Sequence, residues 1–409
     1  MRSAFPRVHV VALTLLLLVC GFCIFRFLAA SAAGQNAWTY GDWMTSYAAG
    51  FTRRGLSGTV INSVSTISRL STPQLFLLIN LALYAFIGLR IALTYGRAPA
   101  SNILFLFFPT SLAFLIWDAA IIGRKDTLLI AFAFMTSLLA RHGGERGGSL
   151  HFWFALSLAL AVLVLIHDSF VFFIPLLVVV TCAGSAAVPK SLAVLKRVFA
   201  ASSLPGLVFL MLIAFRQPLD LDLLFDALGS DGANLRAACR ASQVASGRDA
   251  WMGGGSICYL NTPLSVSLRH VWQDLAPILI ARSMVTGGVL LAITTGYFVI
   301  LTTDAAARGR IALLIVLGLL ATLPLYAIAI DWGRWLYMTT MIFAANLPPR
   351  DGASRIGGIS VWSFCAAIAA LSLTTVSHTR SPMFTMRGLE VVTKAADIAR
   401  RPYSTLNQR

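Results

Sequence analysis

Ionisable side chains are few in this sequence, and those that could do chemistry stand at or near the ends of apolar segments. They comprise five aspartates, five cationic side chains and one histidine. The aspartates are Asp42, Asp118, Asp126, Asp168 and Asp331, the cations are Arg53, Arg54, Arg124, Lys125 and Arg334, and the histidine is His167. Arginine and lysine bind phosphate oxygens, whereas a carboxylate or an imidazole takes a proton from an attacking hydroxyl. These residue types predict a transfer reaction on a phosphate-linked substrate at a membrane boundary.

Each group has an expected role. We expect the five cations to bind the substrate phosphate and either Asp42 or His167 to serve as the general base, with Asp168 beside the histidine as a further catalytic candidate. An imidazole titrates near neutral pH, which favours His167 on acidity alone. Supporting roles are expected for Tyr47, Asp118, Asp126, Asp331 and Tyr337. For any one of these side chains the alternative is an interfacial anchor, because charged and aromatic residues favour helix ends.

The bulk composition indicates a membrane protein. Hydrophobic residues make up 58% and charged residues 12% of the 409 residues, and the mean hydropathy is +0.80. These values exclude a soluble globular chain and predict an all-α polytopic membrane protein. The net charge of +16 does not indicate nucleic-acid binding. Much of the Lys and Arg lies in short loops between apolar segments, so this charge reflects membrane topology.

About eleven apolar runs have the length of membrane spans, some of them only with flanking residues. They cover residues 10–30, 74–95, 102–122, 127–139, 150–166, 170–187, 198–215, 284–302, 311–330, 336–347 and 356–375. We therefore expect one integral membrane domain over residues 1–409, without a separate soluble domain.

Basic residues between these runs predict the orientation of the chain. With the amino terminus in the cytoplasm, the loops with an excess of Lys and Arg all lie inside. These loops carry Arg97, Arg141, Arg146, Lys190, Lys196, Arg197, Arg308, Arg310, Arg350 and Arg355. The chemically suggestive clusters then share the outer face, in an opening loop (31–72), at 123–126, 167–169 and 331–335, and in a longer loop (216–269). With eleven spans the basic tail (377–409) would lie outside, against the positive-inside rule. The sequence therefore does not decide on which side of the membrane the tail lies.

The opening loop has an amphipathic pattern. Its aromatic residues recur every three or four positions, namely Tyr40, Trp43, Tyr47 and Phe51. This spacing predicts an outer interfacial helix with its aromatic stripe toward the lipid and Asp42 toward the water, ended by Gly55 and Gly58.

The longer outer loop mixes aspartates with arginines and contains three successive glycines at 253–255. It is either a folded lid over a substrate groove or a solvated connector. Its two cysteines, Cys239 and Cys258, could form a disulfide if the outer face is an oxidising compartment.

Two short charged motifs resemble those of a known family. Gly123-Arg124-Lys125-Asp126 opens one helix, and His167-Asp168-Ser169-Phe170 leads into the helix after next. Together with Asp42 and Tyr47 in the opening loop, this arrangement resembles the Wzy/EpsG-type polysaccharide polymerases. The resemblance covers residues 40–180, with a weaker echo at 334–337.

The opening loop is also similar to that of GT-C glycosyltransferases, whose catalytic acid follows the first helix. This second resemblance favours Asp42 as the base. The sequence departs from the common GT-C pattern because it lacks an Asp-x-Asp or Asp-Glu pair at this place and a large carboxy-terminal soluble domain.

The resemblances imply a membrane glycosyltransferase of surface polysaccharide assembly. The first expectation is a polymerase that joins polyprenyl-diphosphate-linked repeat units on the outer face of the bacterial inner membrane. The alternatives are a GT-C transferase that uses a polyprenyl-phosphate sugar donor, and a flippase or transporter of a lipid-linked glycan. Expected partners are the polyprenyl-linked glycan, membrane lipid and other envelope glycan-assembly proteins, without nucleic acid. No cofactor is expected, and a divalent metal enters only with the GT-C alternative.

Overall fold

The computed structural model of the chain describes most of its central part. The described residues are 37–95, 105–106, 108–117, 121–142, 149–184, 190–215, 217, 220–228, 230–244, 256–259, 277–302, 305–328, 331–347, 355–356 and 359–360, with single positions at 14, 18, 21–22, 25, 265, 268 and 272.

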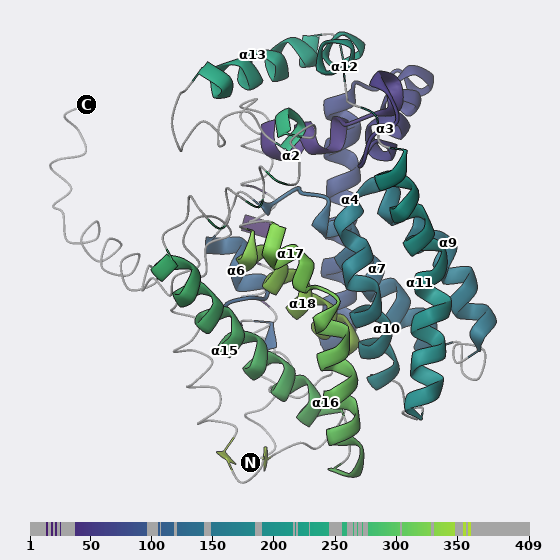
Figure 1. Cartoon of the computed structure of the whole chain (residues 1–409), viewed down its shortest axis with the longest axis vertical. Helices are drawn as coiled ribbons and strands as arrows, with labels where there is room; N and C mark the ends of the chain where they lie inside the picture. Colours follow the sequence, from purple (N-terminus) through teal and green to yellow (C-terminus); the bar gives the residue numbers. More distant parts are fainter. Residues whose placement is uncertain are drawn as a thin grey trace, which may run out of the picture.

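The described chain is helical, which confirms the predicted all-α class apart from one two-residue strand pair (Figure 1). The α-helices are α2 (Ala37–Met44), α3 (Leu56–Ser68), α4 (Thr72–Tyr95), α6 (Leu112–Trp117), α7 (Asp126–His142), α9 (Leu150–Ile166), α10 (Ile174–Ala183), α11 (Ser191–Ala214), α12 (Leu221–Ala227), α13 (Ser230–Val244), α15 (Pro277–Thr302), α16 (Ala305–Leu320), α17 (Leu323–Ile328) and α18 (Trp332–Asn346). Short 3-10 turns are η1 (Tyr47–Ala49), η3 (Asp168–Phe173) and η5 (Ser256–Tyr259). The strands β1 (Arg355–Ile356) and β2 (Ile359–Ser360) pair antiparallel.

Helix α18 forms the centre of the bundle. All of its 15 residues are buried, and it packs against α7, α10 and α15. Two of its polar groups find partners inside: Thr340 shares a hydrogen bond with Thr110 at 2.8 Å, and the Tyr95 hydroxyl donates to the carbonyl of Ala344 at 2.6 Å. Because a buried polar group without a partner costs about 1–3 kcal/mol, such pairs allow a threonine-bearing helix to lie in an apolar interior.

The perimeter helices α4, α9, α11, α15 and α16 expose apolar side chains. Examples are Leu89, Phe154, Leu210, Val285 and Leu317. Lipid covers such a surface favourably, whereas water does not. Three described segments are long and apolar enough to cross a membrane, namely Thr72–Tyr95, Ser191–Ala214 and Arg308–Ile328. Shorter apolar helices are Leu150–Ile166, Asp168–Ala183 and Met284–Ile300. The structure is therefore that of a membrane protein.

The predicted spans are confirmed only in part. The run 150–166 coincides with α9, which begins where the Ser149 hydroxyl accepts a hydrogen bond from the Phe152 N–H at 3.2 Å. The prediction of one helix over 102–122 is wrong, because the chain turns at residues 108–111 before the six-residue α6. Pro109, which lacks a backbone N–H, stands in that turn.

Four further predictions extend beyond the described residues. The predicted run 311–330 is interrupted by a turn at residues 321–322, which separates α16 from α17. The β1–β2 pair stands where the run 356–375 was predicted to begin. The rest of that run, most of the run 10–30 and the whole of the tail (377–409) lie outside the described residues.

The predicted interfacial helix of the opening loop is wrong in two respects. The helix ends at Met44, and Asp42 is fully buried instead of facing water. Gly58 does not end a helix but lies within α3, where its N–H donates to the carbonyl of Thr45 at 3.0 Å. A Cβ at Gly58 would collide with that carbonyl. The glycine therefore allows α3 to approach the end of α2, which folds the loop back on itself.

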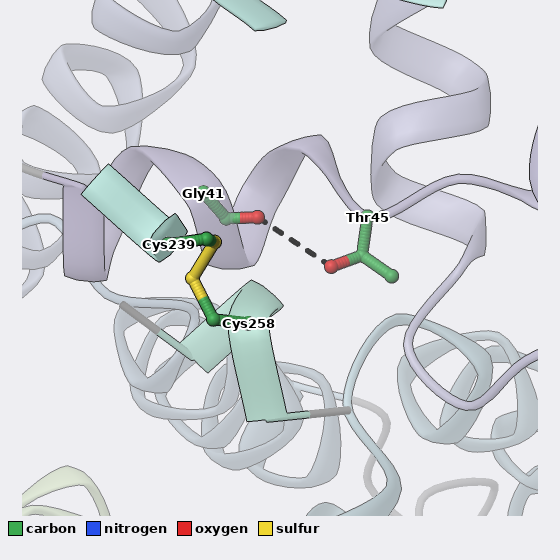
Figure 2. Close-up of a disulfide and its surroundings, with 4 residues drawn as sticks. All are labelled: Gly41, Thr45, Cys239 and Cys258. Carbon is green, nitrogen blue, oxygen red and sulfur yellow. Dashed lines mark hydrogen bonds between the residues drawn. A yellow bond between two sulfur atoms is a disulfide. The ribbon is translucent and has the colours of Figure 1, made fainter. Parts of the chain in front are cut away.

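Helices α12 and α13 with η5 form a structure that we call the cap. Figure 1 shows α12 and α13 at the same end of the bundle as α2 and α3. The cap packs on α2 and η1, so the described part of the loop 216–269 is folded and is not a solvated connector. The predicted disulfide between Cys239 and Cys258 is confirmed, with a Cα–Cα distance of 5.5 Å (Figure 2).

Candidate functional site

The predicted acidic candidate Asp42 lies at the centre of a charged cluster. Its Oδ1 atom is 3.5 Å from Nη1 of Arg54 and 4.0 Å from Nζ of Lys125. Burial alone would raise the pKa of the Asp42 carboxyl, but the charges of Lys125 and Arg54, with Arg124 and Arg334 behind them, outweigh burial and hold it at about 2. The second oxygen, Oδ2, is buried and has no hydrogen-bond partner among the described residues. It is thus an ionised carboxylate oxygen with an unfilled acceptor position, in a side chain that is fully buried.

Neighbouring residues fix α2 above the start of α7. The indole Nε1 of Trp43 donates to the carbonyl of Gly123 at 2.7 Å, and Ser57 donates to the carbonyl of Trp43 at 2.9 Å. Gly123 has a φ of 83°, a conformation that glycine adopts without the steric penalty of a Cβ. The glycine at the head of Gly123-Arg124-Lys125-Asp126 therefore turns the chain so that its carbonyl meets α2 while the next three side chains enter the cluster.

Arg54 and Lys125 join three parts of the chain. Nε of Arg54 donates to Oδ1 of Asp168 at 2.8 Å, so the guanidinium lies between that carboxylate and Asp42. Nζ of Lys125 donates to the carbonyls of Arg54 at 3.3 Å and of Ile166 at 3.0 Å. Burial lowers the pKa of Lys125 to about 8, against the opposing charge of Asp42. The opening loop, the start of α7 and the end of α9 are thereby held together by these two cations.

The backbone of Arg54 is strained. Its φ of 68° lies in the left-handed region, which costs a residue with a Cβ about 1–2 kcal/mol. The ion pairs of its side chain with Asp168 and Asp42 and the hydrogen bond from Lys125 to its carbonyl compensate this cost. Strain of this kind is typical of functional sites.

Arg334 anchors the other half of the cluster from the first turn of α18. Its Nε and Nη2 atoms donate to the two carboxylate oxygens of Asp126, Nη2 at 2.8 Å, and its Nη1 donates to Asp331 at 2.9 Å. The guanidinium also lies 4.5 Å from the centroid of the Trp335 ring. Arg124 is 3.9 Å from Asp331 and extends the network. The bidentate contact between Arg334 and Asp126 requires a planar guanidinium and is specific to arginine.

Both ring nitrogens of His167 are engaged. Nε2 is 3.1 Å from Nη2 of Arg334, and Nδ1 is 2.7 Å from the hydroxyl of Ser169. A guanidinium only donates, so Nε2 is the acceptor and Nδ1 carries the proton. Burial, followed by the charges of Arg54 and Arg334, places the pKa of His167 well below its ordinary value. His167 is therefore a neutral residue that holds Arg334, stacked on Phe170 with ring centroids 4.9 Å apart.

Solvent reaches only part of the cluster. The side chains of Arg53, Arg54, Asp168 and Asp331 are 31%, 17%, 13% and 20% exposed, whereas those of Asp42, Lys125 and His167 are fully buried. Arg53 pairs with Asp168 at 3.7 Å, and both members of this ion pair are partly exposed. Five cations face four carboxylates in the cluster, which leaves a net charge of +1 with a neutral histidine. A partly exposed rim of arginines with excess positive charge suits an anionic ligand.

Three predicted residues are not joined to the cluster by the described contacts. Tyr47 stacks on Phe51 with centroids 5.5 Å apart, and Tyr337 stacks on Phe114 at 5.4 Å. Asp118 lies outside the described residues. The other predicted site residues come together, in the groupings that the hydrogen bonds and ion pairs above describe.

Three further residues hold the site through contacts that the sequence does not predict, and one of them, Trp43, was expected in the lipid-facing aromatic stripe. These are Trp43, Ser57 and Ser169. The first and last adjoin Asp42 and Asp168, so adjacency to a predicted acid is a signal that could have found them. Nothing in the sequence marks Ser57, because its role arises from the close approach of α3 to α2.

The chain matches no protein-family model, no curated protein sequence and no solved structure. The resemblance to Wzy/EpsG-type polymerases therefore stays a prediction, and function is argued from the site itself.

Proposed function

We propose that this protein is a membrane glycosyltransferase that polymerises polyprenyl-diphosphate-linked repeat units on the outer face of the bacterial inner membrane. The observation that carries the proposal is the buried carboxylate of Asp42, whose Oδ2 has an open acceptor position beside Arg54 and Lys125. A base next to cations is the minimum that sugar transfer from a phosphate-linked donor needs. The apolar perimeter of the protein supports a lipid-borne donor.

Asp42 is the better candidate for the base. His167 was the alternative, but its Nε2 accepts from Arg334 and its Nδ1 donates to Ser169, so neither nitrogen is open to a substrate hydroxyl. Oδ2 of Asp42 has no such partner among the described residues. We therefore assign proton removal to Asp42 and a positioning role to His167.

The low pKa of Asp42 fits a reaction in which the donor binds first. In the absence of substrate, the pKa of about 2 would make this carboxylate a weak base. A bound diphosphate adds negative charge near Arg54 and Lys125 and offsets their effect, so the pKa of Asp42 rises toward its ordinary value. Donor binding thereby prepares the base for the acceptor hydroxyl.

The proposed reaction balances without a cofactor. The acceptor hydroxyl oxygen bonds to the anomeric carbon of the donor sugar, and the bond from that carbon to the diphosphate oxygen breaks. The hydroxyl proton passes to Oδ2 of Asp42 and leaves the site with the departing products, because the pKa of the carboxyl falls again once the diphosphate has left. The diphosphate leaves on its polyprenyl carrier, stabilised by Arg53 and Arg54, the two most exposed of the arginines whose contacts are described above. Each charge-assisted hydrogen bond of this kind contributes about 1.5–3 kcal/mol.

The disulfide supports the outward orientation of the site. Disulfides persist in oxidising compartments such as the bacterial periplasm and are rare in the cytosol. The Cys239–Cys258 bond lies in the cap, and the cap packs on α2, the helix that carries Asp42. The same compartment must therefore contain the cap and the proposed base.

Purified protein in liposomes with a polyprenyl-diphosphate-linked repeat unit tests the proposal. We expect wild type to form products of two or more units and Asp42→Asn to be slower by roughly 10²–10⁴-fold. Asp222→Asn, which changes a carboxylate 75% exposed in the cap, is the matched control and keeps the wild-type rate. An Asp42→Asn variant with the wild-type rate refutes the assignment.

Two other outcomes of this experiment identify the alternatives. Transfer of single sugars from a polyprenyl-monophosphate donor, without use of the diphosphate donor, indicates a GT-C transferase. Movement of the lipid-linked unit between leaflets without a new glycosidic bond indicates a flippase.

A further inference from the structure

Helix α2 lies between the cap and the charged cluster. On the cap side, Ile257 of η5 and Leu235 of α13 pack against Gly41. A Cβ at Gly41 would lie 3.0 Å from Cγ2 of Ile257 and 3.4 Å from Cδ2 of Leu235. Both apolar side chains are buried. A side chain at position 41 therefore requires Ile257 to shift by a few tenths of an ångström.

The disulfide closes the cap at the same place. Cys239 follows Leu235 by one helical turn, and Cys258 follows Ile257 directly, so the covalent bond joins the two segments that touch α2. Figure 2 shows the disulfide beside Gly41, whose carbonyl accepts a hydrogen bond from the Thr45 hydroxyl at 3.4 Å. The bond thus fixes Ile257 relative to Leu235, and the pair fixes one side of α2.

The other side of α2 faces the cluster. Asp42 follows Gly41 in the chain and meets Arg54 and Lys125 at 3.5 Å and 4.0 Å, while Trp43 is tied to Gly123 at 2.7 Å. Asp42 is therefore the residue next to Gly41, at which the cap contacts α2. A displacement of α2 changes the position of Oδ2 relative to the cations, and small misplacements of a catalytic group cost large factors in rate.

We propose that the disulfide-closed cap positions Asp42 for proton transfer, with Gly41 and Ile257 as positioning residues. This inference rests on the proposed role of Asp42 as the base. It assigns the Cys239–Cys258 bond a role in turnover in addition to its role in stability. Of the two donor-binding arginines, Arg53 lies outside this contact because it pairs with Asp168 of η3, whereas Arg54 contacts both Asp168 and Asp42.

The test uses the full-length protein in lipid nanodiscs with two measurements. The first is amide hydrogen exchange of α2, and the second is the kcat and KM of sugar transfer from the diphosphate-linked donor. The variants are Gly41→Ala and the double replacement of Cys239→Ala with Cys258→Ala. The control is Gly88→Ala in α4, because a Cβ at Gly88 meets nothing within 4 Å. Alanine favours helices over glycine, so Gly41→Ala does not weaken α2 through propensity.

We expect both cap variants to raise the exchange of α2 and to lower kcat by roughly 10-fold or more, with a smaller change in the KM for the donor. Gly88→Ala should match wild type in both measurements. Ile257→Ala, which removes the side chain nearest to Gly41, should likewise raise the exchange of α2 and lower kcat.

Three results overturn the inference. They are unchanged exchange in both cap variants, raised exchange with an unchanged kcat, and a loss confined to the KM for the donor. If wild type transfers no sugar, the proposed function fails, and raised exchange in the cap variants then shows only that the cap holds α2. If the double cysteine variant unfolds globally, amide exchange rises throughout the core helix α18. The exchange and kcat of Gly41→Ala alone then test the inference.

Discussion

Nε2 of His167 accepts a hydrogen bond from Nη2 of Arg334 at 3.1 Å, although the two residues are 167 positions apart in the chain. Through this hydrogen bond the imidazole helps to hold a buried guanidinium that also binds Asp126. A histidine with this task must remain neutral, because protonation would turn the acceptor into a donor facing a cation. The charged groups that act on it are Arg54, Arg124, Lys125, Arg334 and Asp168.

The first prediction concerns the pH dependence of stability. Since the pKa of His167 in the folded protein lies well below 6.5, the unfolded chain binds a proton that the folded chain does not as the pH falls below that value. The free energy of unfolding should therefore decrease on acidification, approaching about 1.4 kcal/mol per pH unit for this residue. His167→Gln, whose amide can accept from Arg334 and donate to Ser169, should remove this part of the dependence. Thermal unfolding at pH 7 and pH 5 measures it, and equal shifts in both proteins would contradict it.

The sequence predicted the helices best where local signals decide. The boundaries of α9 coincide with those of the apolar run 150–166, which is visible without a structure. The run 102–122 has a similar composition, but Pro109 and the turn at 108–111 interrupt it. Hydropathy reports average apolarity and does not show which apolar segments are packed inside the protein.

The residues of the site were predictable, but their environment was not. Scarcity of charge and position at segment ends indicated Asp42, Arg54 and Arg334. The burial of Asp42 was not predicted, because the spacing of the aromatic residues says nothing about Arg54. The turn between α2 and α3 brings Arg54 to Asp42, and the ion pair allows the carboxylate to be buried. Likewise, the partner of Arg334 is Asp126, 208 residues away, and no local pattern connects them.

The second prediction concerns donor binding by Arg53. Its side chain is more exposed than those of Arg54, Arg124 and Arg334, so it should contact the phosphate directly. Arg53→Gln should raise the KM for the diphosphate-linked donor by roughly 10–100-fold, the equivalent of about 1.5–3 kcal/mol for one charge-assisted bond. Arg236→Gln, at a partly exposed arginine paired with Asp226 in the cap, is the control with an unchanged KM. Equal kinetics of the two variants would place the phosphate elsewhere.

The third prediction concerns the geometry of Arg334. Arg334→Lys keeps the charge but loses the bidentate contact with Asp126 and the bond to His167. We expect the free energy of unfolding to fall by about 1.5–3 kcal/mol or more, because a lysine satisfies fewer of these buried acceptors. Arg141→Lys is the control, since Arg141 donates to the carbonyl of Leu347 at 3.0 Å, a bond that lysine can also make. Denaturant titration of both variants compares them, and losses of the same size would show that the bidentate contact is not decisive.

The last prediction concerns which side of the membrane holds the site. Helix α7 begins at Asp126 inside the cluster and ends at His142, so its two ends are separated by about 24 Å at 1.5 Å per residue. Leu223 in the cap and His142 at the far end of α7 are both exposed, which makes them suitable positions for single cysteine probes. In intact cells a membrane-impermeant maleimide should label Leu223→Cys and should label His142→Cys only after permeabilisation. The native Cys239–Cys258 pair does not react while it is oxidised. The reverse labelling pattern would place Asp42 and its cations in the cytoplasm, where a disulfide is not expected to persist and where an outer-face polymerase cannot work.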